Sequence, residues 1–368
     1  MGNSTDGDRA VPIADTPDAL TAAWLTEALW ANGHLASAAV SEVVSTPVGT
    51  GQMCDSLRLH LSYDGPTDAP PTLVAKLPAA DETSRATALS LGSYENEVRF
   101  YQELAGGLPV STPAVFHADI DVETASFVLL LADAAPATQG DQLAGCSAGV
   151  AEVALDELVR LHAPRWGDPT LADLPWLHRD RAQSQQFLLM LLPMLWKGFR
   201  ERYASSLTTW TVQAGELLIT DLEPYLCADS EPWSILHGDY RLDNLLFDPS
   251  PGGVPVTVVD WQTVSHGPAL QDVSYFLGAG LLEEERREAE QALVRQYHHA
   301  LVAAGVTDYG WDRCWSDYRR GTWAGLVMAI AASMLVERTD RGDQMFLTMA
   351  SRHARHAMDL DAVELLRT

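Results

Sequence analysis

A polar cluster between two short apolar runs is the feature of this sequence that most constrains its fold. An apolar run that begins at Ile235 stops at a cluster containing Asp239 and Asn244, and the next apolar run starts directly after Asn244. A further apolar run follows the turn-forming residues 248–253 and ends on Asp260. Short apolar runs separated by turn residues are typical of buried strands. The pattern predicts a hairpin with Asp239, Asn244 and Asp260 together at one end.

The rest of the chain shows two different periodicities. Apolar and polar residues alternate over 57–61, the period of a half-buried strand, and strand-like apolar runs occupy 72–77 and 126–131. A helical pattern covers 89–104, and helical patterns dominate from residue 148 onward. A β-rich first part followed by a mostly helical second part predicts an α+β fold with two lobes.

The predicted boundaries follow the change of periodicity. We expect a mobile tail over 1–15, an N-lobe over 16–134 and a C-lobe over 135–368, with a hinge near 133–140. A chain of 368 residues is long enough for one large two-lobed domain with a buried core.

Composition excludes several classes of partner. The formal net charge of −26 argues against nucleic acid and anionic membranes, which attract basic surfaces. The four cysteines are too scattered for a zinc site or a disulfide framework. The apolar runs 187–196 and 322–335 are too short to span a bilayer, and the N-terminus does not have the pattern of a signal peptide. We therefore expect a cytoplasmic protein; its oligomeric state is not predicted.

The residue types of the polar cluster suit a metal that is bound together with phosphate. Carboxylate and amide oxygens are hard ligands, of the kind that Mg²⁺ shares with substrate phosphates. Taken singly, Asp239 and Asn244 could be turn residues and Asp260 a cap at the end of a strand. All three at this spacing, behind buried strands, favour a magnesium site.

Lys76 is the second informative residue. The chain has only two lysines, Lys76 and Lys197, against 22 arginines, and Lys76 lies inside the apolar strand pattern of 72–77. A lysine in a chain that otherwise uses arginine suggests a site that needs a compact point charge. The alternative is an edge-strand lysine that discourages aggregation.

The run His-Gly-Asp-x-x-x-x-Asn at 237–244, with the apolar strand and Asp260 after it, resembles the aminoglycoside-phosphotransferase and choline-kinase superfamily. It also has the spacing of the protein-kinase catalytic loop. The stretches 23–26, 140–143 and 158–166 resemble the ecdysteroid-kinase-like branch. The resemblance implies a two-lobed protein-kinase-like fold, with a small β-rich N-lobe and a large, mostly helical C-lobe. It also implies a kinase that uses Mg²⁺ and ATP or GTP to phosphorylate a hydroxyl group on a small molecule.

The resemblance gives the residues of the polar cluster separate roles. Asp239 would be the catalytic aspartate, which orients the acceptor hydroxyl and takes its proton. Arg241 lies where protein kinases have a lysine that contacts the transferring phosphate. Asn244 and Asp260 would hold the metal ions, and His237 would support the loop. Phosphoryl transfer needs positioning and charge neutralisation more than a strong base, so an aspartate is adequate.

The resemblance also implies nucleotide contacts in the N-lobe. Lys76 would bind the α- and β-phosphates. Glu97 would be its partner, because it fits the Glu-x-x-Phe-Tyr pattern of the family, whereas Glu95 would point elsewhere. Gly49 and Gly51 lie between two predicted strands, where such kinases fold a loop over the phosphates; a Gly-x-Gly pair alone is a weak signal.

The purine would hydrogen-bond to the backbone between Leu131 and Asp133. Asp272 matches the family aspartate that supports the catalytic loop, and we interpret both Asp272 and His162 as structural. Trp261-Gln262 replaces the Phe-Gly of protein kinases, so regulation through that motif is not expected. The preference between ATP and GTP stays open.

The acceptor is the least constrained part of the prediction. Tryptophan-rich residues 174–225 and 311–343 are expected to form its pocket. An antibiotic, an amino alcohol, a sugar or nucleoside and a steroid-like alcohol are all open, and the first would include a role in antibiotic resistance. The main alternative is a catalytically silent nucleotide-binding pseudokinase. A protein kinase is disfavoured because there is little room for an activation segment after Asp260, and a metal-dependent hydrolase because no His-rich ligand set is present in the sequence.

Overall fold

The computed structural model describes residues 11–49, 53–178, 181–228 and 231–367. These residues form two compact units. The first unit contains the described residues up to Glu103 together with Pro113–Ala134. The second contains Leu104–Thr112 and the described residues from Ala135 onward.

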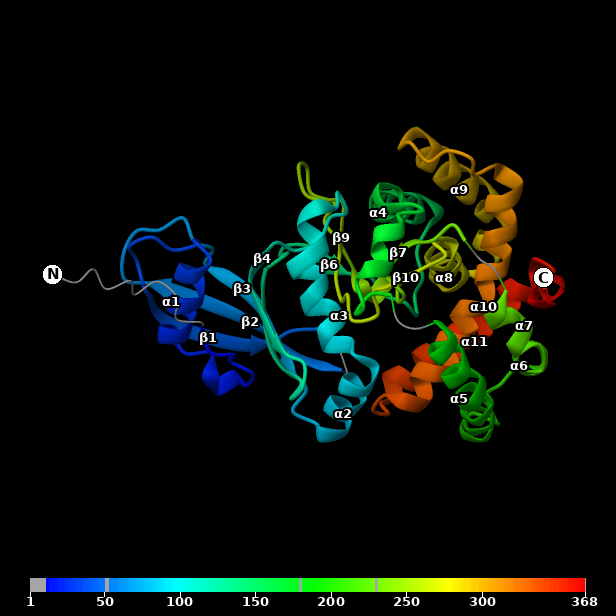
Figure 1. The fold of residues 1–368 in the computed structure, drawn as a ribbon, viewed down its shortest axis with the longest axis horizontal. Helices are drawn as coiled ribbons and strands as arrows, with labels where there is room; N and C mark the ends of the chain where they lie inside the picture. Colours follow the sequence, from blue (N-terminus) through cyan, green and yellow to red (C-terminus); the bar gives the residue numbers. More distant parts are fainter. Residues whose placement is uncertain (1–10, 50–52, 179–180, 229–230, 368) are drawn as a thin grey trace. The chain divides into compact units, whose positions relative to one another are not determined.

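The first unit is built on a sheet of five antiparallel strands, in the order β1-β2-β3-β5-β4 (Figure 1). The strands are β1 (Val40–Pro47), β2 (Cys54–Tyr63), β3 (Thr72–Pro78), β4 (Val115–Asp121) and β5 (Ser126–Ala132). Leu57, Leu59 and Leu61 of β2 are buried while His60 is exposed, so the predicted alternation is confirmed. The predicted strands over 72–77 and 126–131 are confirmed as β3 and β5. Strand β4 was not predicted.

Helix α1 (Ala22–Ala31) covers one face of this sheet. Thr21 caps the helix by accepting a hydrogen bond from the Trp24 backbone N–H, and Leu25 and Leu29 join the buried core. The preceding residues also pack here, because Ala14 is buried and the Asp15 carboxylate accepts a hydrogen bond from Ser126. The described end of the predicted tail thus packs on this unit, residues 1–10 lie outside the described residues, and the boundary at residue 15 stays a prediction.

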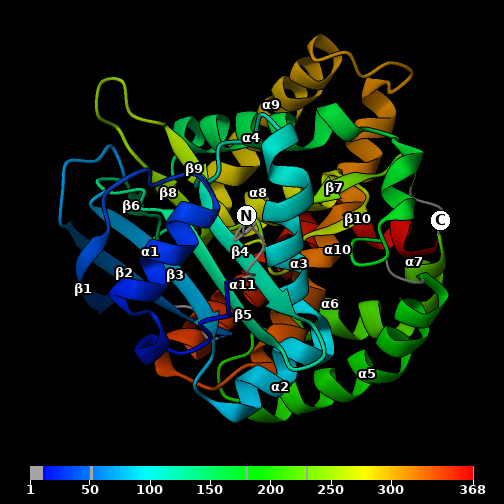
Figure 2. The ribbon, with the colours of Figure 1, turned by 60° about the vertical axis from the view of Figure 1, so that its left-hand side comes forward.

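Two helices replace the single helix predicted over 89–104. Helix α2 (Glu82–Leu91) ends at Gly92, and α3 (Ser93–Arg99) begins there and continues into a π-helical turn at Phe100–Leu104. Gly92 has a φ of 65°, a left-handed conformation that glycine adopts without steric penalty, and this breaks the helix. Helix α3 packs on β4 and β5 (Figure 2).

The second unit is mostly helical, as predicted. Its helices are α4 (Ala148–His162), α5 (Arg181–Arg202), α6 (Thr209–Thr220), α7 (Leu222–Cys227), α8 (Leu270–Gly280), α9 (Glu283–Ala303), α10 (Trp311–Leu335) and α11 (Asp340–Asp359). Helices α8, α10 and α11 pack against one another around a core that includes Tyr275, Trp323 and Met349.

Two small sheets interrupt these helices. Strands β8 (Leu245–Phe247) and β9 (Val256–Val258) form the predicted hairpin, and β6 (Thr138–Gln139) extends it. Strand β7 (Ser234–Leu236) pairs instead with β10 (Ser265–Gly267). The loop at 237–244 therefore connects two different sheets.

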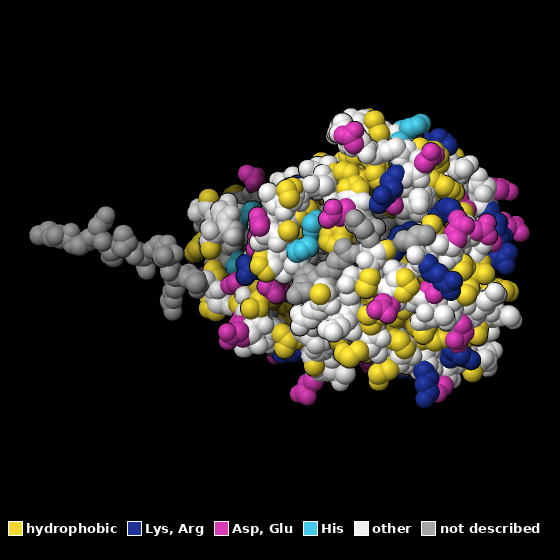
Figure 3. Space-filling model, turned by 45° about the vertical axis from the view of Figure 1, so that its right-hand side comes forward, with side chains coloured by type: hydrophobic (Ala, Val, Ile, Leu, Met, Phe, Trp, Pro, Cys, Tyr) yellow, Lys and Arg dark blue, Asp and Glu magenta, His cyan; other side chains and the backbone are white. Residues whose placement is uncertain are grey.

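No helix in the described part of the chain is long and apolar enough to cross a membrane. On the face drawn in Figure 3, lysine and arginine side chains lie among aspartates and glutamates and form no continuous basic surface.

Candidate active site

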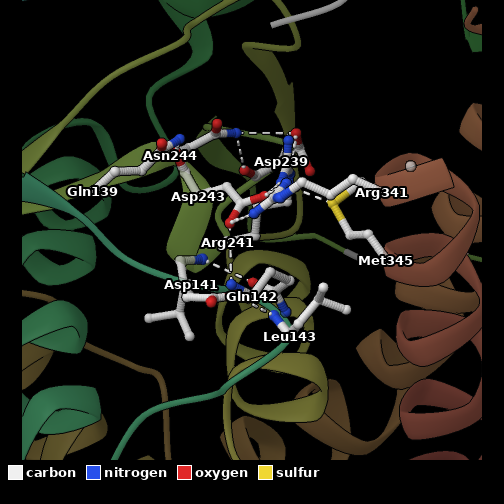
Figure 4. Close-up of polar contacts among 12 residues, drawn as sticks. Gln139, Asp141, Gln142, Leu143, Asp239, Arg241, Asp243, Asn244, Arg341 and Met345 are labelled. Carbon is white, nitrogen blue, oxygen red and sulfur yellow. Dashed lines mark hydrogen bonds and ion pairs between the residues drawn. The ribbon is translucent and has the colours of Figure 1, made fainter. Parts of the chain in front are cut away.

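The Asp239 carboxylate is held by three hydrogen bonds. Tyr275 of α8 donates its hydroxyl hydrogen to Oδ1 at 2.6 Å. Arg241 Nε donates to Oδ2 at 2.9 Å, and Asn244 Nδ2 donates to the same oxygen at 3.0 Å (Figure 4). The Asp239 side chain is nevertheless 21% exposed. The carboxylate is thus fixed in orientation and still open to a reactant.

Backbone contacts to Asp272 fix the loop that carries Asp239. Asp272 is buried on α8 and accepts the backbone N–H groups of His237 at 2.7 Å and Gly238 at 3.0 Å. His162 Nε2 lies 3.3 Å from the same carboxylate. This geometry agrees with the interpretation of Asp272 and His162 as structural residues.

His237 and Gly238 shape the start of the loop. His237 Nε2 donates to the backbone oxygen of Val259 at 3.0 Å, and Nδ1 accepts the Asp239 backbone N–H at 3.3 Å. Gly238 has a φ of 83°, and a Cβ there would lie 2.5 Å from the backbone oxygen of Thr263. Only glycine fits this turn without displacing Thr263.

Strand pairing brings Asp260 next to Asn244. Asp260 follows β9, and the backbone N–H of Val259 donates to the backbone oxygen of Asn244 at 3.0 Å. Asp260 has a φ of 67°, which is strained for a non-glycine residue. Strain of this kind is common at functional sites.

The two residues predicted to hold Mg²⁺ have a fitting set of donor atoms. Asn244 Nδ2 donates to both the backbone oxygen and Oδ2 of Asp239, which fixes the amide orientation. No described residue donates a hydrogen bond to Asn244 Oδ1. One amide oxygen and the Asp260 carboxylate suit Mg²⁺, which takes one or two protein carboxylates and completes its shell with phosphate and water.

Arg241 lies in a network of ionised side chains that reaches α11. Its Nη1 donates to Asp243 Oδ2 at 2.7 Å and contacts Met345 Sδ at 3.2 Å (Figure 4). Arg341 of α11 and the backbone N–H of Gln142 also donate to the Asp243 carboxylate, at 3.0 to 3.2 Å.

The charges in this network stabilise one another against burial. Burial alone would raise the pKa of Asp243, but the hydrogen bonds from Arg341 and the charge of Arg241 hold it below its ordinary value. Burial alone would lower the pKa of Arg241, yet the charges of Asp239 and Asp243 raise it above its ordinary value. Both side chains are therefore charged at neutral pH.

The first unit holds the predicted lysine pair. Lys76 Nζ on β3 lies 2.6 Å from Glu97 Oε1 on α3, and the two side chains are 10% and 1% exposed. Because side chains alternate along a strand, Lys76 points away from the face on which Ala75 and Leu77 join the core. Glu95 is half-buried and makes no such pair with a described residue.

The other described residues predicted to contact the nucleotide lie at the ends of strands β1 and β5 or close to them. Gly49 lies two residues after the end of β1 with a φ of 80°, and Gly51 lies outside the described residues. Leu131 is buried in β5. The Asp133 side chain forms a paired contact with Arg58, at 2.8 and 3.1 Å.

Three residues of this arrangement were not predicted as site residues. Tyr275 carried a signal, since it lies three residues after Asp272 and hence on the same side of a helix that faces the loop. Asp243 and Arg341 lie about a hundred residues apart and carry no local signal.

Comparison with solved structures shows the fold. A microcompartment-associated aminopropanol kinase has a TM-score of 0.51 and 13% identity, and the match covers 92% of this chain and 99% of that one. A macrolide 2′-phosphotransferase from Brachybacterium faecium has a TM-score of 0.47 and 15% identity, covering 92% and 96%. An ethanolamine kinase from Plasmodium vivax has a TM-score of 0.49 and 9% identity, covering 85% and 82%. The match to the aminopropanol kinase confirms the predicted α+β protein-kinase-like fold. At 13% identity it shows the fold alone.

Sequence comparison shows the family. No curated protein matches the chain significantly. None of these comparisons tests the resemblance to the ecdysteroid-kinase-like branch, which stays a prediction. The model of the phosphotransferase enzyme family matches residues 66–314, which is more than half of the chain and includes Lys76, Asp239 and Asp260. The protein is therefore a member of the phosphotransferase enzyme family.

Proposed function

We propose that the protein transfers the γ-phosphoryl group of Mg²⁺-bound ATP or GTP to a hydroxyl group on a small molecule. The observation that supports this most strongly is the position of Asp239. Asn244 donates a hydrogen bond to the Asp239 carboxylate. The backbone oxygen of Asn244 accepts the backbone N–H of Val259, the residue before Asp260. A base and two metal ligands thus lie within one small hydrogen-bonded unit.

The hydrogen bonds of Asp239 leave one favoured position for the acceptor. A carboxylate has about four acceptor positions, two on each oxygen. Oδ2 already accepts from Arg241 and Asn244, whereas Tyr275 is the one described residue that donates to Oδ1. The acceptor hydroxyl would therefore donate to Oδ1, beside the Tyr275 hydroxyl.

The reaction follows from this placement. The acceptor oxygen forms a bond to the γ-phosphorus as the bond from that phosphorus to the β,γ-bridging oxygen breaks. The hydroxyl proton passes to Asp239, and the nucleoside diphosphate leaves. Asp239 needs no unusual basicity, because the proton is lost late in a loose transition state.

The remaining residues bind and neutralise phosphate. Asn244 and Asp260 would hold Mg²⁺, which neutralises charge on the phosphate oxygens when it is bound. Lys76, held in place by Glu97, would contact the α- and β-phosphates. Arg241 would position Asp239 through Nε, and its Nη2, which bonds to no described residue, would contact the transferring phosphate.

Two assignments complete the proposal. Gly49, Gly51 and the backbone from Leu131 to Asp133 would contact the nucleotide. Residues 16–134 would serve nucleotide binding, and residues 135–368 would supply the catalytic loop, metal ligands and acceptor pocket.

A mass-spectrometric screen tests the proposal. The protein is incubated with Mg²⁺, ATP and GTP, and a library of hydroxylated small molecules, beside an Asp239→Asn control. We expect at least one library member to gain one phosphoryl group with wild type only. Nucleotide binding without any transfer would contradict the proposal and support a nucleotide-binding module instead.

A further inference from the structure

A pocket of about 200 Å³ lies beside Asp239, entirely within the second unit. Gly238, which precedes Asp239 in the loop, is one of the residues that line it. Tyr275 lines it as well, and its hydroxyl is hydrogen-bonded to the Asp239 oxygen that has a free acceptor position. A molecule in this pocket is thus placed next to the carboxylate that would take its proton.

One wall of the pocket is apolar. It is formed by Leu236 of β7 and by Ala324 and Met328 of α10. Ala324 and Met328 lie one helical turn apart and therefore present one continuous apolar surface. This wall favours a carbon skeleton over a fully hydrated polar group.

The rest of the lining includes polar, uncharged side chains. Thr263, Ser265 and Gln271 contribute two hydroxyls and an amide. The Thr263 hydroxyl donates to the backbone oxygen of His237 at 2.8 Å. Among the described residues, none hydrogen-bonds to Ser265 Oγ or to the Gln271 side-chain amide. These two groups remain available to a ligand, and both donate and accept hydrogen bonds.

The lining offers little to a cation. Its one ionisable carboxylate is Asp272, which is 1% exposed and already accepts from His237, Gly238 and His162. Asp239 itself is paired with Arg241.

Tyr275 supplies one aromatic ring, and His353 stacks on it at 5.2 Å between ring centroids. Burial lowers the pKa of His353 well below its usual value, so the imidazole ring stacked on Tyr275 carries no charge either. An ammonium group in this pocket would lose water without gaining an ion pair or an aromatic cage.

We propose that this pocket binds the acceptor, and that the acceptor is a small uncharged alcohol with an apolar face and a further hydroxyl or carbonyl group for Ser265 and Gln271. The inference rests on the proposed function, and it narrows the acceptor class. The volume lies below the roughly 300–1,000 Å³ typical of sites for drug-sized ligands. The acceptor, or the part of it that enters the pocket, is therefore about the size of a single ring or a short branched chain.

Matched alcohols that differ mainly in charge test the inference. One pair is glucose and glucosamine. The other is choline and its uncharged carbon isostere, in which a tert-butyl group replaces the trimethylammonium group. The ratio of kcat/KM for the uncharged to the cationic member is measured for each pair with wild type, by mass-spectrometric quantification of the phosphorylated product. We expect wild type to favour the uncharged member by about tenfold or more, since a charged group that leaves water without gaining a partner is disfavoured by at least that factor.

Two variants place a charge in the pocket. Gln271→Glu adds a carboxylate at almost constant shape, and Ser265→Asp does so from β10. Each is expected to lower the ratio by about tenfold or more. Gln291→Glu makes the same chemical change on an exposed position of α9 and should leave the ratio unchanged. Thermal melting identifies a variant that has failed to fold, in which case the other variant decides.

The outcomes separate the inference from the proposed function. A wild-type preference for the cationic member, or ratios that neither folded variant changes, would overturn the inference while transfer itself stands. Absence of transfer to every alcohol, charged or uncharged, would overturn the proposed function and the inference with it.

Discussion

The ion pair between Lys76 and Glu97 supports a prediction that separates stability from activity. Lys76→Met removes the ammonium group while keeping an apolar chain of similar length. It leaves the Glu97 carboxylate, whose side chain is 1% exposed, without a charge that now lies 2.6 Å away. Glu97→Leu removes the carboxylate beside the Lys76 ammonium group. The Lys76 side chain is 10% exposed, so its charge can move toward water.

The burial of the pair sets the expected magnitudes. Removing one partner of a buried pair costs about 3–5 kcal/mol, because the other charge stays buried. We expect Lys76→Met to lie in this range and Glu97→Leu somewhat lower. Replacing both partners with apolar groups is about neutral or slightly stabilising. The double variant should therefore recover to within about 2 kcal/mol of wild type.

Urea unfolding of the four proteins measures these free energies, and a phosphoryl-transfer assay is run on the same preparations. All three variants should lose transfer, including the stable double variant, because Lys76 is either missing or no longer held in place by Glu97. Lys197→Met is the matched control. Lys197 is the only other lysine, its side chain is 79% exposed, and it lies 4.0 Å from Glu201, so its loss should change stability by about 0.5 kcal/mol at most.

Two results would refute this reasoning. A Lys76→Met protein as stable as the Lys197→Met control would show that the pair is not buried in solution. Full transfer by the double variant would remove Lys76 from the nucleotide site.

Three further predictions concern the catalytic loop. Asp260→Gly tolerates the left-handed backbone but removes the carboxylate, so it should weaken Mg²⁺-dependent nucleotide binding in calorimetric titrations. Unchanged affinity would remove Asp260 from the metal site. Tyr275→Phe keeps the ring but removes the donor to Asp239, and since hydrogen bonds to charged groups contribute about 1.5–3 kcal/mol, kcat should fall by about tenfold or more with a smaller change in KM. A wild-type kcat would contradict that role. Gly238→Ala forces a Cβ to within 2.5 Å of the Thr263 oxygen and should cost about 2 kcal/mol or more in urea unfolding, whereas wild-type stability would show that the loop can shift.

The polar cluster could be predicted from sequence because its geometry is local. Asp239 and Asn244 lie in one short loop, and the hairpin that follows has a turn of recognisable residues. Pairing of β8 with β9 then places Asp260 beside Asn244. Lys76 could likewise be identified, because a lysine inside an apolar strand breaks the pattern around it.

The rest depends on contacts between distant elements. The Asp243–Arg341 ion pair joins a loop to α11, and the periodicity of neither segment predicts it. Strand β10 has the sequence Ser-His-Gly, which has no strand-forming pattern of its own, and it forms a strand by pairing with β7. The break at Gly92 was missed because the apolar period continues across it, and the pocket beside Tyr275 exists only once α8 and α10 are packed.

The central claim is that Asp239 takes the proton of an alcohol during phosphoryl transfer. It is tested most directly by measuring transfer and nucleotide affinity together for wild type and Asp239→Asn, with an alcohol that wild type phosphorylates. Asparagine can still accept a hydrogen bond from Tyr275 but cannot take a proton at neutral pH. We predict that Asp239→Asn binds Mg²⁺-nucleotide as wild type does and transfers no phosphoryl group to the alcohol. Transfer at the wild-type rate by Asp239→Asn would contradict the account.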